Sequence, residues 1–401
     1  MKNKSNTFLI FVLGLLAALG PFSIDMYLPG FKAIAVGLNT TVNDVALTLS
    51  GYFIGISAGQ LLYGPLLDKF GRKKPLYFGI ALYLLASAAC FTAVNINQLI
   101  LFRFIQAVGS CAAAVAAIAL VRDLFEPDQR PKVFASLMLV IALSPMLAPT
   151  AGGYLIGAFG WQSVFIFLSL MAIVTLALSY FFIPDVFVPD PSYSLKPIPI
   201  IRNFIAVINE RQFTIYAGLG ALVFSGLFVY VASSPIVFME LYGVSQTGYG
   251  WIFAGLSVTF IGSSQLNSLL LKWYASEKII GYAIILQVLA SVVFLLFAFE
   301  GWLNLTNTLV FLSFYLIGLG FINPNAAALA LAPFDKNAGS ASALMGAGQM
   351  GLGALASVVV SSFPSSSVLP MPIIMTTATI LGAIILYFSA RNTNVNAPTS
   401  N

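Results

Sequence analysis

Residues 64–75 read GPLLDKFGRKKP and separate two apolar stretches that are each long enough to cross a bilayer. Gly64 and Pro65 loosen the end of the preceding helix, and the carboxylate of Asp68 can accept hydrogen bonds from neighbouring amides. Gly71 permits a tight turn. The four cations of the segment hold it on the cytoplasmic side. The segment therefore predicts a short cytoplasmic turn between two membrane-spanning helices.

The rest of the chain extends this pattern in both directions. Hydrophobic residues make up 59% of the 401 positions and charged residues only 8%, more apolar material than a soluble core of this size buries. A span needs about 20 apolar residues to cross roughly 30 Å. We predict an all-α polytopic membrane protein with twelve transmembrane helices. The predicted spans are 8–28, 45–66, 75–94, 98–120, 133–156, 161–182, 212–237, 247–271, 279–299, 303–331, 338–362 and 368–390.

The positions of Lys and Arg test this helix count independently, because cytoplasmic loops hold an excess of positive charge. With the N-terminus inside, 16 of the 18 basic residues fall on the cytoplasmic side, only Lys32 falls outside, and Arg103 lies within the fourth span. We therefore expect both termini in the cytoplasm. The net charge of +5 follows from this topology and is no evidence for nucleic-acid binding.

The N-terminal apolar run could also be read as a secretory signal peptide, since Lys2 and Lys4 precede it. Its removal would upset the alternation of every later loop, so we interpret it as the first span. The chain has no His, and its two cysteines, Cys90 and Cys111, lie in predicted spans without a metal-binding pattern. We expect no metal and no cofactor, and any proton chemistry must use carboxylates.

One long polar stretch divides the chain. It contains five prolines and several charges, which is typical of a linker. The predicted parts are an N-terminal six-helix half (1–182), a cytoplasmic linker (183–211), a C-terminal six-helix half (212–391) and a cytoplasmic tail (392–401). A shift of 205 positions superposes Gln60 on Gln265 and Lys73 on Lys278, a weak echo of the kind found in transporters built from repeats.

The segment 64–75 resembles the loop signature of the major facilitator superfamily. A merely basic inside loop would explain the cations but not the order of Gly-Pro, Asp and Gly-Arg. The resemblance implies the major facilitator fold, with this loop forming part of a cytoplasmic latch between the halves. Arg122 and Asp123, at the inner end of the fourth span, are plausible partners for the loop. The predicted gating residues are Gly64, Asp68, Gly71, Arg72 and Arg122.

Two further segments narrow the resemblance. Residues 101–109 (LFRFIQAVG) look like the fourth-helix motif of proton-coupled members, whose Arg, here Arg103, is associated with proton transfer. Residues 142–161 are similar to the fifth-helix signature of antiporters, although ordinary small-residue packing is the alternative for its glycines. The antiporter motif comprises Pro145, Pro149, Gly152, Gly153 and Gly157. Together with SIDMYLP at 23–29, the chain most resembles the Bcr/CflA drug-resistance transporters, which are drug:proton antiporters.

Asp25 and Arg103 are the only acid and base that we place inside spans. An intramembrane carboxylate costs roughly 2.5 to 3.5 kcal/mol, so it needs compensation or a use. Asp25 lies roughly 6 Å before the exit of its helix and Arg103 roughly 7.5 Å inside the fourth, so the opposite charges share a level. They can form a proton-coupling pair, a static salt bridge between two helices, or neither if Asp25 faces exterior water.

We expect proton-coupled efflux of amphipathic drugs by alternating access, with Asp25 as proton carrier coupled to Arg103. The tentative substrate residues are Tyr27, Tyr52, Phe53, Gln106, Met146, Tyr230 and Asn323, each of which packing would also explain. A proton-coupled exporter of an amino acid, a peptide or a siderophore shares every one of these features. The resemblance implies a monomer in the bacterial inner membrane that is driven by the proton gradient, is not an enzyme and does not bind nucleic acid.

Overall fold

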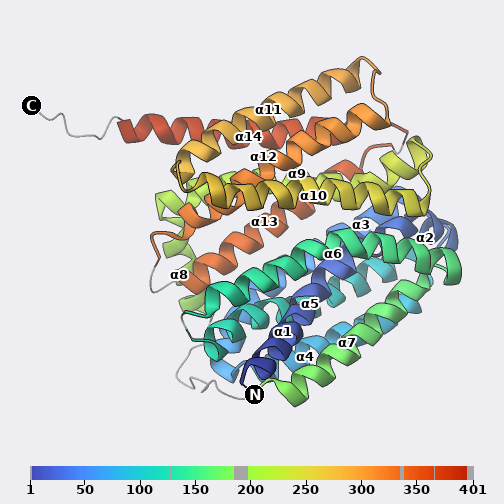
Figure 1. Cartoon of the computed structure of the whole chain (residues 1–401). Helices are drawn as coiled ribbons and strands as arrows, with labels where there is room; N and C mark the ends of the chain where they lie inside the picture. The colour runs from blue at the N-terminus through green and yellow to red at the C-terminus, as the bar shows by residue number, and fades with distance from the viewer. Residues whose placement is uncertain (1, 127, 185–196, 335–337, 365, 395–401) are drawn as a thin grey trace, which may run out of the picture. The chain divides into compact units, whose positions relative to one another are not determined.

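The computed structural model describes residues 2–126, 128–184, 197–334, 338–364 and 366–394. Every regular element in these ranges is helical, which confirms the all-α prediction (Figure 1). Some predicted features lie outside the described residues: Lys196, Lys336, most of the predicted linker before 197 and the tail after 394.

The long helices follow the predicted spans closely. The first six are α1 (Lys2–Asp25), α3 (Val42–Phe70), α4 (Lys73–Phe91), α5 (Ile96–Leu124), α6 (Arg130–Phe159) and α7 (Gln162–Phe182). The next six are α9 (Arg211–Ser234), α10 (Gln246–Leu270), α11 (Ser276–Phe299), α12 (Leu305–Leu331), α13 (Ala338–Ser361) and α14 (Pro370–Asn394). Four short elements complete the described chain: η1 (Leu28–Gly30), α2 (Phe31–Gly37), α8 (Pro197–Ile208) and η2 (Pro235–Leu241).

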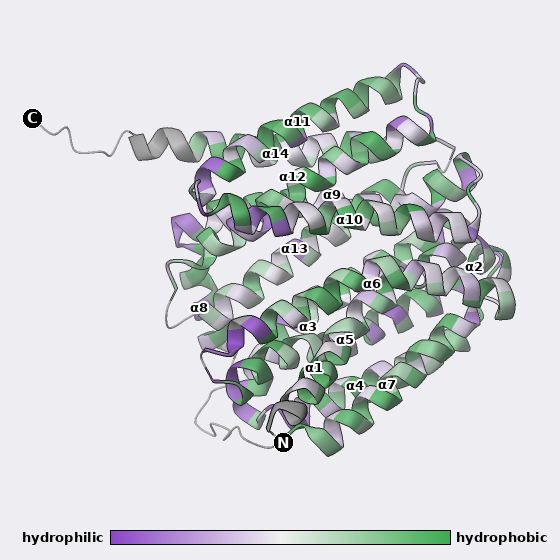
Figure 2. Ribbon diagram, in the orientation of Figure 1, coloured by the Kyte–Doolittle hydropathy of each residue, from purple (hydrophilic) through white to green (hydrophobic). Residues whose placement is uncertain are grey.

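Eleven helices in the described ranges are long and apolar enough to cross a membrane. The exception is α10, which has 25 residues and was expected as the span 247–271. Its second half contains the polar run SSQLNS at 263–268, which lowers its hydropathy. Figure 2 shows that the long helices are otherwise green along their middles, with hydrophilic residues at their ends. Twelve spans and cytoplasmic termini therefore stay predictions.

The first helix ends earlier than the sequence predicted. The predicted span runs to residue 28, whereas α1 ends at Asp25 and a 3-10 turn follows. Pro29 explains the difference, because in a continued helix its ring would clash with the carbonyl of Asp25 and it has no N–H to donate there. Asp25 is therefore the last residue of α1, and the unpredicted short helix α2 begins at Phe31.

The turn within residues 64–75 is shorter than predicted, because the two helices were expected to end at 66 and to begin again at 75. Helix α3 continues through Pro65 and ends at Phe70, and α4 begins at Lys73. Gly71 adopts φ +81°, a backbone conformation that side chains disfavour.

The chain forms two compact units. Unit 1 comprises residues 1–200 and 238–257, and unit 2 comprises 201–237 and 258–401. Residues 238–257, including the first half of α10, group with unit 1, and the boundary between residues 200 and 201 divides the predicted linker within α8 (Pro197–Ile208).

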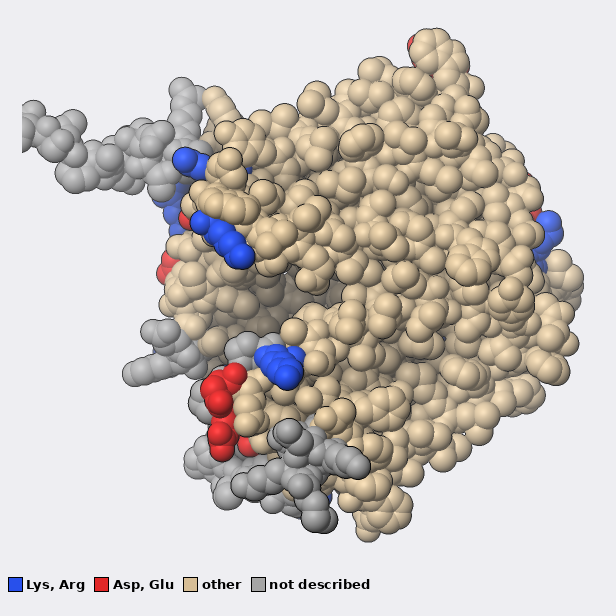
Figure 3. All heavy atoms as spheres, viewed as in Figure 1, with Lys and Arg blue, Asp and Glu red and all other residues tan. Residues whose placement is uncertain are grey.

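Both units repeat one packing pattern. In unit 1, α1 packs against α5, α6 and α7, and α4 packs against α5 and α7. In unit 2, α9 packs against α12, α13 and α14, and α11 packs against α12 and α14. The two sets match in chain order, as an internal repeat requires. On the face shown in Figure 3, charged side chains lie at helix ends and the surface between them is uncharged.

Candidate functional site

Arg103 is the centre of a buried polar site in unit 1. It is the largest fully buried side chain in the described chain, with no exposed surface. Its guanidinium carbon lies 4.8 Å from the ring centre of Tyr27 and 4.3 Å from that of Tyr52, so two aromatic rings contact the cation. Its Nη1 donates to Gln106 Oε1 at 2.7 Å, and its Nη2 donates to the carbonyl of Ser23 at 2.8 Å.

Hydrogen bonds extend from this site to three neighbouring helices. Gln106 Nε2 donates to Ser87 Oγ on α4 at 2.7 Å. The hydroxyls of Ser23 and Tyr83 are 2.6 Å apart. The hydroxyls of the two rings that contact Arg103 are also occupied: Tyr27 pairs with Thr48 of α3, and Tyr52 with Ser110 of α5. The site is therefore a connected network across α1, α3, α4 and α5.

Asp25 lies beside this network without entering it. Its side chain is buried, with 5% of its surface exposed. Arg103 binds the carbonyl of Ser23, two residues before Asp25, and forms no ion pair with the carboxylate. Among the described residues the ion pairs are Lys32–Glu240, Arg72–Asp68 and Arg72–Asp123. The static salt bridge that the sequence left open is thus absent from this structure.

Arg103 also stabilises the end of α1. Ser23 is among the last four residues of the helix, whose carbonyls have no partner within it. A cation at this end interacts favourably with the helix dipole. One of the guanidinium donors, Nε, is buried without a hydrogen-bond partner. Arg103 therefore anchors the turn that carries Asp25 and retains one free donor.

Four of the predicted substrate residues are enclosed in this structure. Tyr27, Tyr52, Phe53 and Gln106 have at most 1% of their surface exposed, and three of them contact Arg103. Tyr230 of α9 is buried as well, whereas Met146 of α6 is partly exposed. In unit 2 the partly exposed Asn323 accepts a hydrogen bond from Gln349 Nε2 at 3.0 Å. Asn325 donates to Asn267 at 2.6 Å, so amides form the polar groups of this part of unit 2.

The predicted gating loop contains a charged cluster. Arg72 Nη1 lies 2.8 Å from Asp68 Oδ1, and Arg72 Nε lies 2.6 Å from Asp123 Oδ2. The pKa of Arg72 is raised above its ordinary value. Partial burial acts to lower this pKa, but the hydrogen bonds and negative charges of Asp68 and Asp123 have the larger, opposite effect. Arg122 is exposed, and the next residue, Asp123, is the one that forms the ion pair with Arg72. A Cβ at Gly64 would meet nothing within 4 Å.

The predicted antiporter motif lies in α6, which continues through Pro145 and Pro149. Its glycines have different surroundings. A Cβ at Gly152 would lie 1.9 Å from the carbonyl oxygen of Met26, the residue after Asp25. A Cβ at Gly153 would lie 3.1 Å from the carbonyl of Gln246, and one at Gly157 would meet only a side-chain oxygen at 3.7 Å. Gly152 is therefore the position where α6 needs glycine.

The architecture and these motifs agree with comparisons to known proteins. The sequence model of the Major Facilitator Superfamily matches residues 13–358. The chain belongs to this superfamily. It is thus a secondary transporter rather than an enzyme, and a multi-pass membrane protein that carries small molecules.

Related members of the superfamily carry names that refer to drugs. The chain is 32% identical to a bicyclomycin resistance protein homolog of Haemophilus influenzae, over 98% of this chain and 99% of that protein. It is 30% identical to the multidrug resistance protein MdtL of Shigella flexneri, over 84% and 83% of the two chains. The likeness to the Bcr/CflA transporters is confirmed.

Solved structures of major facilitators share the fold. A bacterial homolog of the human lysosomal transporter Spinster superposes with a TM-score of 0.74 at 13% identity, covering 96% of this chain and 97% of that one. A D-xylose–proton symporter gives a TM-score of 0.73 at 14% identity, covering 95% and 97%. At these identities the likeness concerns the fold alone.

We expect Gly152→Ala to destabilise this major facilitator, whereas Gly157→Ala is tolerated. The methyl group at 152 would collide with backbone, which cannot rotate away, and overpacking of this kind costs about 1–3 kcal/mol. Thermal unfolding of the purified variants measures the difference. If both glycines tolerate Ala equally, the close approach of α6 to Met26 is not present in solution.

We expect Asp123→Asn to destabilise the cytoplasmic end of unit 1. The neutral amide loses the ionic part of the bond to Arg72, and bonds to charged groups contribute about 1.5–3 kcal/mol, less at this partly exposed site. Arg122→Gln is the matched control, since this side chain is exposed. Equal melting temperatures for the two variants would contradict the assignment of Asp123 as the partner of Arg72.

The network residues Ser23, Thr48, Tyr83, Ser87 and Ser110 were missed by the sequence prediction. A signal was available, because polar residues recur at helical spacing within the predicted spans. Arg103, Gln106 and Ser110 are spaced i, i+3, i+7 on one helix face. Such a polar stripe inside an apolar helix indicates an interior facing other helices.

Proposed function

We propose that this transporter exports amphipathic drug-like molecules in exchange for protons across the bacterial inner membrane. The observation that carries the proposal is Asp25, a buried carboxylate that has no ion-pair partner in the structure and lies two residues after Ser23, whose carbonyl the buried Arg103 binds. A carboxylate in this position costs free energy, and binding a proton removes its charge. The bicyclomycin and multidrug resistance relatives support drugs as the substrate class.

Arg103 couples the proton to conformation in this proposal. While the guanidinium binds the Ser23 carbonyl, it gives Asp25 no ion pair, and a protonated Asp25 fits that arrangement. A movement of the guanidinium from the carbonyl to the carboxylate would stabilise the anion and release the proton. The two arrangements then correspond to proton-loaded and proton-free states, whose interconversion accompanies alternating access.

The drug binds, in this proposal, to the aromatic, thioether and amide side chains that the sequence predicted. Met146 and Asn323 are partly exposed in the structure, while Tyr27, Tyr52, Phe53, Gln106 and Tyr230 become available only when the site opens. Aromatic rings, a thioether and amides suit partly apolar molecules with a few hydrogen-bonding groups. We further propose that the protein works as a monomer, uses no cofactor, and closes its cytoplasmic side through the cluster of Asp68, Arg72 and Asp123.

Transport by the purified protein in proteoliposomes tests the proposal. A pH gradient and a membrane potential are imposed separately, and the accumulation of bicyclomycin, chloramphenicol and a panel of amphipathic drugs is measured. We expect accumulation that needs the pH gradient and acidifies the compartment the drug leaves. Accumulation of amino acids, peptides or siderophores without any drug would overturn the substrate class, and drug flux without proton flux would overturn the coupling.

A further inference from the structure

Helix α8 (Pro197–Ile208) lies within the predicted linker, where no helix was expected. Its Val207 is fully buried in a cluster with Phe213 of α9, Ala330 of α12 and Ala341 of α13. Ala330 belongs to the last turn of α12 and Ala341 to the first turn of α13. The helix is therefore attached to unit 2 at the ends of α12 and α13 (Figure 1).

A second face of α8 is apolar and uncovered. It consists of four isoleucines, of which Ile198 is 79% exposed, and Ile201, Ile205 and Ile208 are 52%, 52% and 50% exposed. At 100° per residue these side chains fall within an arc of about 80°, which lies between about 100° and about 180° around the helix from Val207. Four exposed isoleucines in one stripe are unusual for a surface that faces water.

The remaining face of α8 is polar. Arg202 and Asn209 are exposed on the side away from Val207, Asn203 is exposed about 40° from Val207 on the flank opposite the isoleucines, and residues 198–208 include no acid. The helix thus has three faces: one packed on protein, one of isoleucines and one polar. A helix that lies in a membrane surface needs this combination, with its apolar face toward the acyl chains and its polar face toward water.

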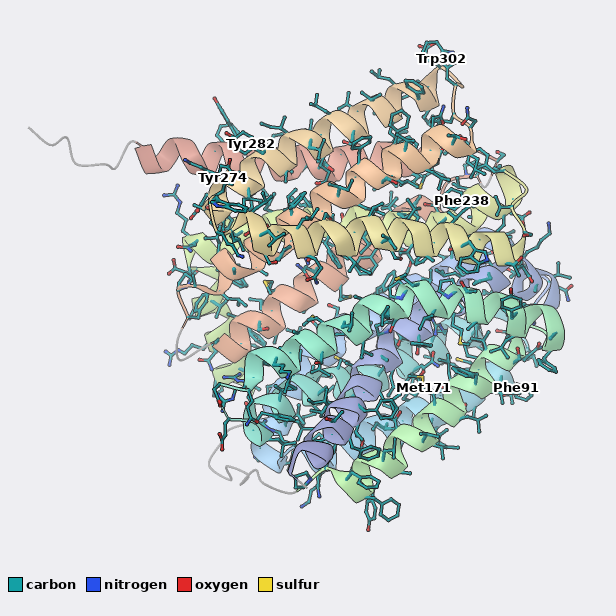
Figure 4. All side chains as sticks on the ribbon, viewed as in Figure 1. Phe91, Met171, Phe238, Tyr274, Tyr282 and Trp302 are labelled. Atoms are coloured by element: carbon teal, nitrogen blue, oxygen red, sulfur yellow. The ribbon has the colours of Figure 1, made fainter. Side chains whose placement is uncertain are left out.

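Aromatic residues mark the membrane boundary at the same end of unit 2. Trp273 and Tyr274, just before α11, are 71% and 51% exposed. Figure 4 shows Tyr274 at one end of α11 and Trp302 at the other. Exposed Trp and Tyr are typical of the two membrane–water interfaces. Short connections join α9 to α10 and α10 to α11, so α9 and α11 begin at the same end, the one that carries Tyr274, and α8 immediately precedes α9.

The charge of this end suits an anionic membrane surface. Arg202 and Arg211 lie in α8 and at the start of α9, and Lys272 and Lys278 flank the start of α11. Glu210 and Glu277 are the acids of the same segments, so cations are in excess. An excess of Lys and Arg indicates the cytoplasmic side, whose leaflet is anionic.

We propose that α8 lies in the cytoplasmic membrane surface, with the isoleucine stripe at the boundary between headgroups and acyl chains of anionic lipids. The position of α8, directly before α9, makes it a lipid-bound anchor at the start of the second half of the transporter. The proposal does not depend on the substrate or on proton coupling.

Spin labels on the full-length protein test this surface. Ile201→Cys and Ile205→Cys place labels on the stripe, and Asn203→Cys is the matched control on the flank opposite the isoleucines. The native cysteines, Cys90 and Cys111, are buried, and labelling of the unmutated protein measures any reaction at these two positions. The protein is reconstituted into phosphatidylcholine vesicles with or without phosphatidylglycerol. Collision of each label with oxygen, which concentrates in lipid, is compared with collision with a water-soluble nickel complex.

We expect oxygen to relax the labels at 201 and 205 more strongly than the nickel complex does, and the reverse at 203. Phosphatidylglycerol should move the label at 205 deeper, and Arg202→Gln should remove that shift. Equal access of nickel to 205 and 203 would show a helix in water, and protection of 205 from both reagents would show a protein contact. Either result overturns the proposal. If the depth of the label at 205 does not change with phosphatidylglycerol, the claim that α8 binds anionic lipids is wrong.

Discussion

Replacing Asp25 by Asn is expected to abolish uphill drug accumulation while downhill exchange of labelled for unlabelled drug continues. Asparagine keeps the size of the side chain and its hydrogen-bonding ability but cannot gain or lose a proton at neutral pH. The buried position of Asp25 means that a neutral residue there is tolerated, so the variant should fold. The loss therefore concerns the driving force and not the path of the drug.

The size of this effect follows from the energy of the gradient. One pH unit corresponds to about 1.4 kcal/mol, which sustains roughly a tenfold concentration ratio for exchange of one proton. In proteoliposomes with such a gradient the Asp25→Asn ratio should fall to one. Glu300→Gln, at an exposed acid after α11, is the control and should keep the native ratio. An Asp25→Asn protein that still concentrates drug assigns the proton to another group.

Replacing Arg103 by Lys is expected to lower both stability and coupling. Lysine keeps the charge, but one ammonium cannot donate to Gln106 and to Ser23 from between two aromatic rings, as the planar guanidinium does. Each hydrogen bond to a charged group contributes about 1.5–3 kcal/mol. Arg103→Met should be less stable still, because it leaves the Gln106 oxygen and the Ser23 carbonyl buried without a donor.

Two measurements separate these contributions. Thermal unfolding in detergent reports stability, and the pH dependence of the drug ratio in proteoliposomes reports coupling. Tyr52→Phe is the matched control, since the ring stays beside Arg103 and the bond of the hydroxyl to Ser110 is lost, at about 1 kcal/mol. We expect this control to retain pH-dependent transport. If Arg103→Lys does so as well, with an unchanged melting temperature, Arg103 neither anchors α1 nor couples the proton.

The long helices could be predicted because a bilayer imposes their length and composition. The predicted ends at residues 182, 299 and 331 coincide with the ends of α7, α11 and α12. The end of α3 was placed at 66 and lies at Phe70, because the helix continues through Gly64 and Pro65 and ends before Gly71. The end of α1 was misplaced because the apolar run continues to Leu28, whereas Pro29 prevents the helix from continuing past Asp25. The short helices α2 and α8 carry too few apolar residues to be recognised as spans, and packing decides their conformation.

The candidate site was predicted in part. Intramembrane charge alone was enough to select Asp25 and Arg103, and helix geometry placed them near one level. The choice of partner could not be predicted, because the Ser23 carbonyl, Gln106 and two aromatic rings all compete for the same guanidinium. Sequence gives the donors and acceptors of a buried network, and only the packing of α1, α3, α4 and α5 decides which of them meet.

The approach of Gly152 to Met26 has a mechanical consequence. Backbone meets backbone there, so the contact contains no side chain whose rotation could absorb a displacement. Met26 follows Asp25 directly, at the end of a helix that Pro29 prevents from continuing. Helix α6 is therefore in rigid contact with this end of α1. A tilt of α6 toward α1 must shift the peptide next to the carboxylate of Asp25, so the proposed proton site responds to the movement of α6.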